Sequence, residues 1–212
     1  MKIYDFFRSG SSHRLRIALN LKGLAYEQVP VNLRTEEHLR ADYARINPQQ
    51  MVPALVDGDH VLVQSPAIIE WLEERFPSPP LLPADPYDRA HVRALAALVG
   101  CDIHPLNNRR VLERLRKRFG ADEATVAEWC GLWIRPGFDA YQALVSSRAE
   151  TGPYSFGLRP TLADAYLVPQ MESARRFGVD LAAWPRLVQI EEECGRLEAF
   201  QRAAPARQAD AS

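Results

Sequence analysis

Three serines and a glycine lie together near the start of the chain, in the run Ser9-Gly10-Ser11-Ser12, which we call the serine turn. One interpretation is helix capping, because serine is among the preferred N-cap residues. A cap needs only one hydroxyl, however, and this turn offers three. The free backbone N–H groups and the positive end of the following helix favour a bound anion. A thiolate placed there would have its pKa lowered, and a serine hydroxyl would donate a hydrogen bond to it.

A second polar segment, Gln64-Ser65-Pro66, also precedes an apolar helical pattern. Serine followed by proline is typical of a helix start, with Ser65 as the N-cap and Pro66 as the first helical residue. The functional alternative places a ligand carboxylate on the Ser65 hydroxyl and N–H, with Gln64 alongside.

Between these two segments, Val52-Pro53 stands directly before a strand-like run. Its position leaves the N–H and C=O of Val52 at an open backbone edge. The Val52–Pro53 bond is a candidate cis peptide. A trans proline at the start of an edge strand is the alternative, and the pattern alone favours it.

The elements that must position these residues alternate over residues 1–76. Apolar periodicity and turn signals predict strands at 2–7, 26–31, 54–56 and 61–63, and helices at 12–23, 36–44 and 65–76. The order βαβαββα predicts a small α/β domain with one mixed sheet. Five prolines in residues 77–86 predict a linker, since they cannot continue a helix.

The remaining residues, 87–212, are predicted to form an all-helical domain. Helices are expected at 86–118, 122–147, 161–177 and about 185–199, followed by a loose tail over 200–212. Thr161 and Asp164 have the spacing of a capping box. Gly100 and Pro105 predict a kink in the first of these helices.

Polar residues gather at this kink and at the end of the helix over 161–177. His104 and Asn108 are four residues apart and share a helical face, whereas Asp102 and Arg109 fall on roughly the opposite face. A solvated helix flank explains these residues equally well. The plain interpretation of Arg175-Arg176 is that cations are favoured at a helix C-terminus.

Composition narrows the classes of function. The 26 basic and 27 acidic residues give a net charge of −1, which provides no overall field to hold nucleic acid or an anionic membrane. The basic stretch 114–118 is diluted by nearby acids and has no interleaved aromatics. No run of 18 apolar residues occurs. Cys101, Cys130 and Cys194 lack zinc-site spacing, so no metal is expected, and their odd number without a signal peptide indicates the cytoplasm.

Taken in order, these features resemble the glutathione transferase family. The resemblance rests on the strand–SGSS–helix turn, NPQQMVPAL, QSPAIIEWLEE, the proline-rich linker and PTLADAYLVPQ, and it covers nearly the whole chain. The run FFRSGSSHRLRIAL is similar to the zeta class, which includes maleylacetoacetate and maleylpyruvate isomerases. The implied fold is a thioredoxin-like domain followed by an all-α domain. Many zeta members have Ser-Ser-Cys where this chain has Ser9-Gly10-Ser11, so the reactive thiol is expected from glutathione alone.

The resemblance also implies a glutathione cofactor, a homodimer and a set of site residues. Ser9 or Ser11 would contact the sulfur, and the Val52 backbone would pair with the cysteinyl part of glutathione. Gln64 and Ser65 would hold its γ-glutamyl end. The other implied glutathione-binding residues are His38 and Gln50 at the glycyl end and, at the kink, Asp102, His104 and Asn108. For His38 the alternative is an ordinary surface residue, and which residues of the kink act across a dimer stays open.

The implied activity is cis–trans isomerisation of a maleyl-type dicarboxylate by thiolate addition, bond rotation and elimination. Arginine suits the two carboxylates, because its planar fork stays charged. The candidates are Arg8, Arg110 and Arg176, since the zeta pattern favours Arg176 over Arg175. The Arg109-Arg110 pair favours maleylpyruvate over maleylacetoacetate. A transferase conjugating electrophiles, which would need an apolar acceptor pocket, and a non-catalytic interaction module, which would have lost the serine turn, are the alternatives.

Overall fold

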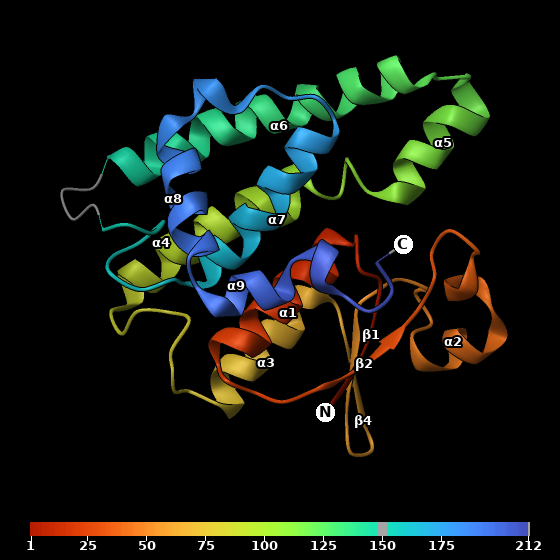
Figure 1. The fold of residues 1–212 in the computed structure, drawn as a ribbon, viewed down its shortest axis with the longest axis horizontal. Helices are drawn as coiled ribbons and strands as arrows, with labels where there is room; N and C mark the ends of the chain where they lie inside the picture. The colour runs from red at the N-terminus through yellow and green to blue at the C-terminus, as the bar shows by residue number, and fades with distance from the viewer. Residues whose placement is uncertain (148–151, 212) are drawn as a thin grey trace. The chain divides into compact units, whose positions relative to one another are not determined.

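The computed structural model describes residues 1–147 and 152–211 of the chain (Figure 1). Two compact units are present. The first comprises residues 1–81 together with 196–212, and the second comprises residues 82–195. The sequence prediction of a first domain over 1–76 and a helical domain over 87–212 therefore differs mainly at the C-terminus, which belongs to the first unit.

The first unit contains a four-stranded sheet in the order β2-β1-β3-β4. Its strands are β1 (Lys2–Asp5), β2 (Glu27–Pro30), β3 (Ala54–Asp57) and β4 (His60–Val63). β1 pairs with β2 in parallel and with β3 in antiparallel orientation, and β3 and β4 form an antiparallel hairpin. The predicted mixed sheet is confirmed.

Helices of the first unit are α1 (Gly10–Leu21), η1 (Glu37–Leu39), α2 (Ala41–Ile46) and α3 (Ser65–Arg75). The predicted helix over 36–44 is split into η1 and α2, because Arg40 between them is extended, with φ −71° and ψ 153°. α1 packs against α3 and against a helix from the C-terminal end of the chain. Residues 12–19 of α1 are all buried as a result.

That C-terminal partner corrects the prediction of a loose tail. Residues 198–211, which we call the C-terminal tail, form α9 (Glu198–Ala203) and η4 (Pro205–Arg207). Phe200 and Ala203 are buried, and the Asn20 side-chain amide donates to the Ala199 carbonyl at 2.9 Å. The low apolar content of the tail is misleading, because hydrogen bonds to the rest of the unit supplement its few buried side chains.

The second unit is helical. Its elements are α4 (Pro86–Ala97), the π-helical segment η2 (Leu98–Ile103), α5 (Arg109–Phe119), α6 (Glu123–Ser146), α7 (Leu162–Arg176), η3 (Leu181–Ala183) and α8 (Pro185–Gly195). Within the described residues, no helix combines the length and the apolar character needed to cross a membrane.

Asp164 secures the start of α7, the helix with the most buried residues in this unit. Its carboxylate accepts hydrogen bonds from the Thr161 N–H at 2.7 Å, from the Thr161 hydroxyl at 3.0 Å and from the Ser155 N–H at 2.8 Å. Burial raises the pKa of Asp164, and these hydrogen bonds oppose the rise. The predicted capping box is confirmed.

Candidate functional site

Three motifs singled out in the first 76 residues come together at the ends of three neighbouring strands of the sheet. The register aligns Tyr4 of β1 with Ala54 of β3, and Ala54 with Val63 of β4. The end of β1, the beginning of β3 and the end of β4 therefore lie side by side. The serine turn, Val52-Pro53 and Gln64-Ser65 are attached to these three strand ends.

The three serine hydroxyls of the serine turn differ in their hydrogen bonds and in their burial. Ser9 is the N-cap of α1, and its Oγ accepts a hydrogen bond from the Ser12 N–H at 3.3 Å. Ser12 is fully buried, and its Oγ accepts from the Phe6 N–H at 3.5 Å. Ser9 and Ser11 are half-buried. Because capping uses only a lone pair of the Ser9 oxygen, its hydroxyl proton can still be donated to a ligand.

The Val52–Pro53 peptide bond is cis, so the trans alternative that the pattern favours is wrong. The Val52 side chain is buried in an apolar cluster with Phe6, Phe7, Val31 and Tyr43. Neither the N–H nor the C=O of Val52 makes a backbone hydrogen bond within the described residues. An extended ligand can therefore pair with this peptide as a strand pairs with its neighbour.

Gln64, and not Ser65, is the N-cap of α3, so the plain capping interpretation of Ser65 is wrong. Gln64 has φ 70° and ψ 108°, and its side chain does not cap the helix. Non-glycine residues in such conformations cost about 1–3 kcal/mol and cluster at ligand sites. Ser65 becomes the first helical residue, with Pro66 after it. The Ser65 hydroxyl takes no part in capping and lies at the positive end of the helix.

The loop before Val52 connects the remaining candidates of the first unit. Gln50 has φ 56°, and its side-chain amide donates to the Leu39 carbonyl at 3.2 Å, next to His38 in η1. Gln49 accepts a hydrogen bond from the Gln64 side-chain amide. His38, Gln50 and Gln64 are thus linked through this loop.

The predicted helical face at the kink is wrong. The chain leaves the helix after η2, because Pro105 has no N–H to continue it, and Asn108 is extended, with φ −68° and ψ 143°. Asn108 caps α5 by accepting from the Arg110 N–H at 3.1 Å. His104 and Asn108 therefore do not share a helical face. Asp102 and Arg110 are exposed, and His104 is half-buried.

The two arginines at the end of α7 have different surroundings. Arg175 forms a two-pronged ion pair with Glu191 of α8. Arg176 donates to the Ser173 hydroxyl at 3.1 Å, and its guanidinium lies 5.0 Å from the centroid of the Phe177 ring. Burial raises the pKa of Cys130 to about 11, and the positive charge of Arg176 opposes this rise. Arg8, the third candidate for a substrate carboxylate, is exposed in the first unit.

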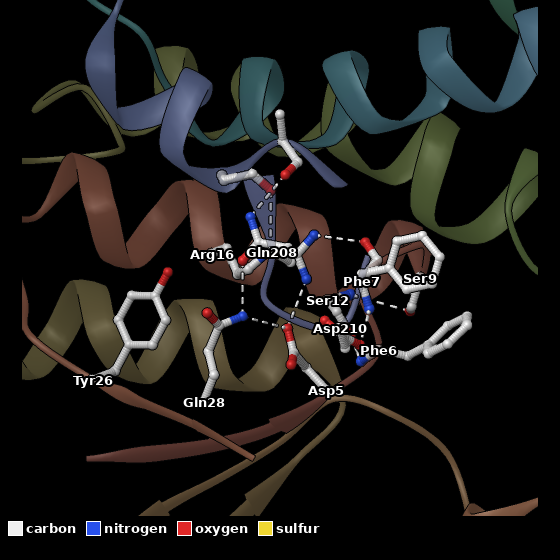
Figure 2. Close-up of polar contacts among 12 residues, drawn as sticks. Asp5, Phe6, Phe7, Ser9, Ser12, Arg16, Tyr26, Gln28, Gln208 and Asp210 are labelled. Atoms are coloured by element: carbon white, nitrogen blue, oxygen red, sulfur yellow. Dashed lines mark hydrogen bonds and ion pairs between the residues drawn. The ribbon is translucent and has the colours of Figure 1, made fainter. Parts of the chain in front are cut away.

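Sequence reasoning missed a fully buried arginine beside the serine turn. Arg16 donates to the Asp5 carboxylate at 2.6 Å, to the Phe7 carbonyl at 2.9 Å and to the Ala203 carbonyl at 3.0 Å (Figure 2). The available signal was an arginine inside the apolar run Leu15–Leu19, with an aspartate at the end of the preceding strand. A buried charge needs such a partner.

Comparison with known proteins places this geometry in a family. Residues 1–74 match the model for the glutathione S-transferase N-terminal domain. The whole chain is 63% identical to the whole of a maleylpyruvate isomerase from a Ralstonia species. It is 51% identical to a maleylacetoacetate isomerase from Pseudomonas aeruginosa, over 99% of this chain and 98% of that protein.

Solved structures agree with the sequence comparison. The holo structure of a maleylpyruvate isomerase, described as a bacterial zeta-class glutathione S-transferase, is 63% identical and matches with a TM-score of 0.99 over 100% of both chains. A maleylacetoacetate isomerase from Methylobacterium extorquens, solved with malonate and glutathione, is 40% identical and matches with a TM-score of 0.95 over 100% of both chains. This chain belongs to the zeta class of the glutathione transferase family.

Proposed function

We propose that this protein is a glutathione-dependent cis–trans isomerase of a maleyl-type dicarboxylate, and that maleylpyruvate is its preferred substrate. The observation that carries the proposal is full-length identity of 63% to a maleylpyruvate isomerase, against 51% to a maleylacetoacetate isomerase. The steady-state kcat/KM for the two substrates should therefore differ in favour of maleylpyruvate. A higher kcat/KM for maleylacetoacetate would overturn the substrate preference but not the reaction class.

The first unit fits glutathione at the strand ends that carry the serine turn, Val52 and Gln64-Ser65. The Val52 peptide is open to pair with the cysteinyl residue of the tripeptide. The Ser65 hydroxyl and the N-terminus of α3 suit the γ-glutamyl carboxylate, with Gln64 alongside. We assign Gln50 and His38 to the glycyl end. In the second unit, we assign further contacts to glutathione from Asp102, His104 and Asn108.

Glutathione, when bound, supplies the thiolate that adds reversibly to the cis double bond and leaves after the bond has rotated. We assign Ser9 the hydrogen bond to this sulfur, because its hydroxyl stands at the N-terminus of α1 and retains a proton to donate. Ser11 is the alternative donor. The helix N-terminus adds a field that favours the ionised thiol. Arg8, Arg110 and Arg176 are assigned to the two substrate carboxylates and to the charge that develops on the substrate.

Variants of Ser9 separate capping from catalysis. Ser9→Asp keeps an N-cap acceptor but removes the hydroxyl donor and adds a negative charge. We expect it to fold with near-normal stability while turnover falls at least about tenfold, because a charge-assisted hydrogen bond is lost and the added carboxylate disfavours the nearby thiolate. Steady-state kinetics and urea unfolding measure the two effects. Ser11→Ala is the matched control, and a large loss in Ser11→Ala with full activity in Ser9→Asp would assign the contact to Ser11 instead.

Ser65→Ala tests the γ-glutamyl contact. Because Ser65 does not cap α3, we expect little change in unfolding free energy, whereas loss of a true N-cap costs about 1 kcal/mol. Glutathione binding should weaken about tenfold, since a hydrogen bond to a carboxylate is lost. Calorimetric titration measures the affinity, and Ser78→Ala, at an exposed serine of the same unit, is the control. Unchanged affinity in Ser65→Ala would remove Ser65 from the site.

We also propose that the protein acts in the cytoplasm as a homodimer. The three cysteines are free, as in a reducing compartment. Light scattering coupled to gel filtration should give the mass of two 23.9 kDa chains.

A further inference from the structure

We propose that the C-terminal tail positions the serine turn, and that Asp210 is the residue through which it does so. This inference rests on the proposed glutathione-dependent function. It concerns only the first unit, which holds both the tail and the turn.

The tail is anchored before it reaches the turn. Gln208 is buried, and its side-chain amide donates to the Arg202 and Ala204 carbonyls at 2.8 and 2.7 Å. Its side-chain oxygen accepts from Gln28 at 2.9 Å, which ties the tail to β2. These bonds fix the tail two residues before Asp210 (Figure 2).

Asp210 and Arg16 hold the two polar groups of Phe7. The Asp210 carboxylate accepts the Phe7 N–H at 3.0 Å. Arg16 donates to the Phe7 carbonyl at 2.9 Å and, through its Nε, to the Ala203 carbonyl of the tail at 3.0 Å. Both backbone groups of Phe7 therefore depend on the tail, one directly and one through Arg16.

Phe7 leads directly into the serine turn. The Ser9 N–H donates to the carbonyl of Phe6, the neighbour of Phe7, at 3.0 Å, and Ser9 caps α1. A shift of the Phe7 backbone therefore moves the Ser9 hydroxyl relative to a bound sulfur. Even a small displacement of the Ser9 hydroxyl weakens its hydrogen bond to the sulfur, because the strength of a hydrogen bond falls steeply as its distance and angle depart from the ideal. Asp210 is thus a positioning residue and not a catalytic one.

The Asp210 carboxylate also carries a negative charge. This charge disfavours a nearby thiolate, whereas the positioning of the Ser9 hydroxyl favours it. Asp5 and Asp210 are negative and Arg16 is positive in this cluster, and the charge of Asp210 contributes to raising the pKa of Asp5. Removing the Asp210 charge alone favours a nearby thiolate. Asp210→Asn removes the charge and keeps an oxygen acceptor for Phe7, whereas Asp210→Ala removes both. The difference between these two variants isolates the hydrogen bond.

The test is the pKa of the glutathione thiol in the binary complex, followed by the ultraviolet absorbance of the thiolate against pH. We expect a thiol pKa about 0.5–1 unit higher in Asp210→Ala than in Asp210→Asn, with kcat about three- to tenfold lower and glutathione affinity little changed. Asp59→Ala, at the far end of the sheet in the β3–β4 turn, is the control and should behave as wild type.

Three outcomes separate the claims. Equal thiol pKa values in Asp210→Ala and Asp210→Asn would overturn the positioning role. A lower melting temperature and kcat in Asp210→Ala than in Asp210→Asn, without a difference in thiol pKa between the two variants, would overturn it as well, by showing a merely structural contact. A wild-type complex that does not lower the thiol pKa at all would instead contradict the proposed function.

Discussion

Replacing Arg176 by alanine is expected to lower kcat/KM for maleylpyruvate by about 10- to 150-fold, because a charged hydrogen bond to a carboxylate contributes about 1.5–3 kcal/mol. Glutathione affinity should survive, since the residues assigned to the tripeptide are intact. The guanidinium of Arg176 donates to the Ser173 hydroxyl at 3.1 Å and lies 5.0 Å from the centroid of the Phe177 ring. Steady-state kinetics and calorimetric titration measure the two quantities.

Arg175→Ala is the matched control for Arg176→Ala. Arg175 lies one residue earlier on the same helix, but its guanidinium is held by Glu191. Its loss removes an exposed ion pair of small energetic value and should leave the kinetics nearly unchanged. If kcat/KM and the affinity for glutathione fell together in Arg176→Ala, the assignment of Arg176 to the substrate would be wrong. It would also be wrong if Arg175→Ala had a lower kcat/KM than Arg176→Ala.

Arg16→Met is expected to lower the free energy of unfolding by about 3–5 kcal/mol, because it leaves the carboxylate of Asp5 buried without its partner. It also frees the carbonyls of Phe7 and Ala203. Urea unfolding of the variant measures the loss. The double variant Arg16→Met with Asp5→Leu should recover part of it, because an apolar pair leaves no unpaired charge. A loss below about 1 kcal/mol in the single variant would contradict the role of this ion pair.

The pH dependence of Arg16→Met has a definite sign. Burial raises the pKa of Asp5, and Arg16 is the largest opposing influence. Without Arg16 the folded-state pKa rises further above its unfolded value. Such a group favours the folded state most at low pH and loses this contribution as the pH rises through the folded pKa. Arg16→Met should therefore be less destabilised at about pH 5 than at about pH 8.

The sheet and the helix starts were predictable where local signals agree with the tertiary structure. The Asp57–Asp59 turn signal and the Thr161–Asp164 spacing each specify one local geometry, and the structure has both. Ser65 shows the limit of this reasoning. Serine before proline is a good cap, yet the chain enters α3 through Gln64 at positive φ, which no propensity favours, and strained residues of this kind cluster at ligand sites.

The C-terminal tail and the kink were beyond local reasoning for a different reason. The tail is held by single groups far away in sequence, such as Arg16 for Ala203 and Phe7 for Asp210, and no periodicity within 200–212 reports them. At the kink, Pro105 signals an interruption but not its length. One helix ends there and another begins at Arg109, capped by Asn108, so His104 and Asn108 do not share the predicted face.

The most direct test of the account is conversion of maleylpyruvate to its trans isomer with and without glutathione. The assignment of the thiol to glutathione, with no cysteine in the serine turn, predicts that turnover requires glutathione and that none is consumed. Conversion at an unchanged rate after glutathione is omitted would contradict the central claim.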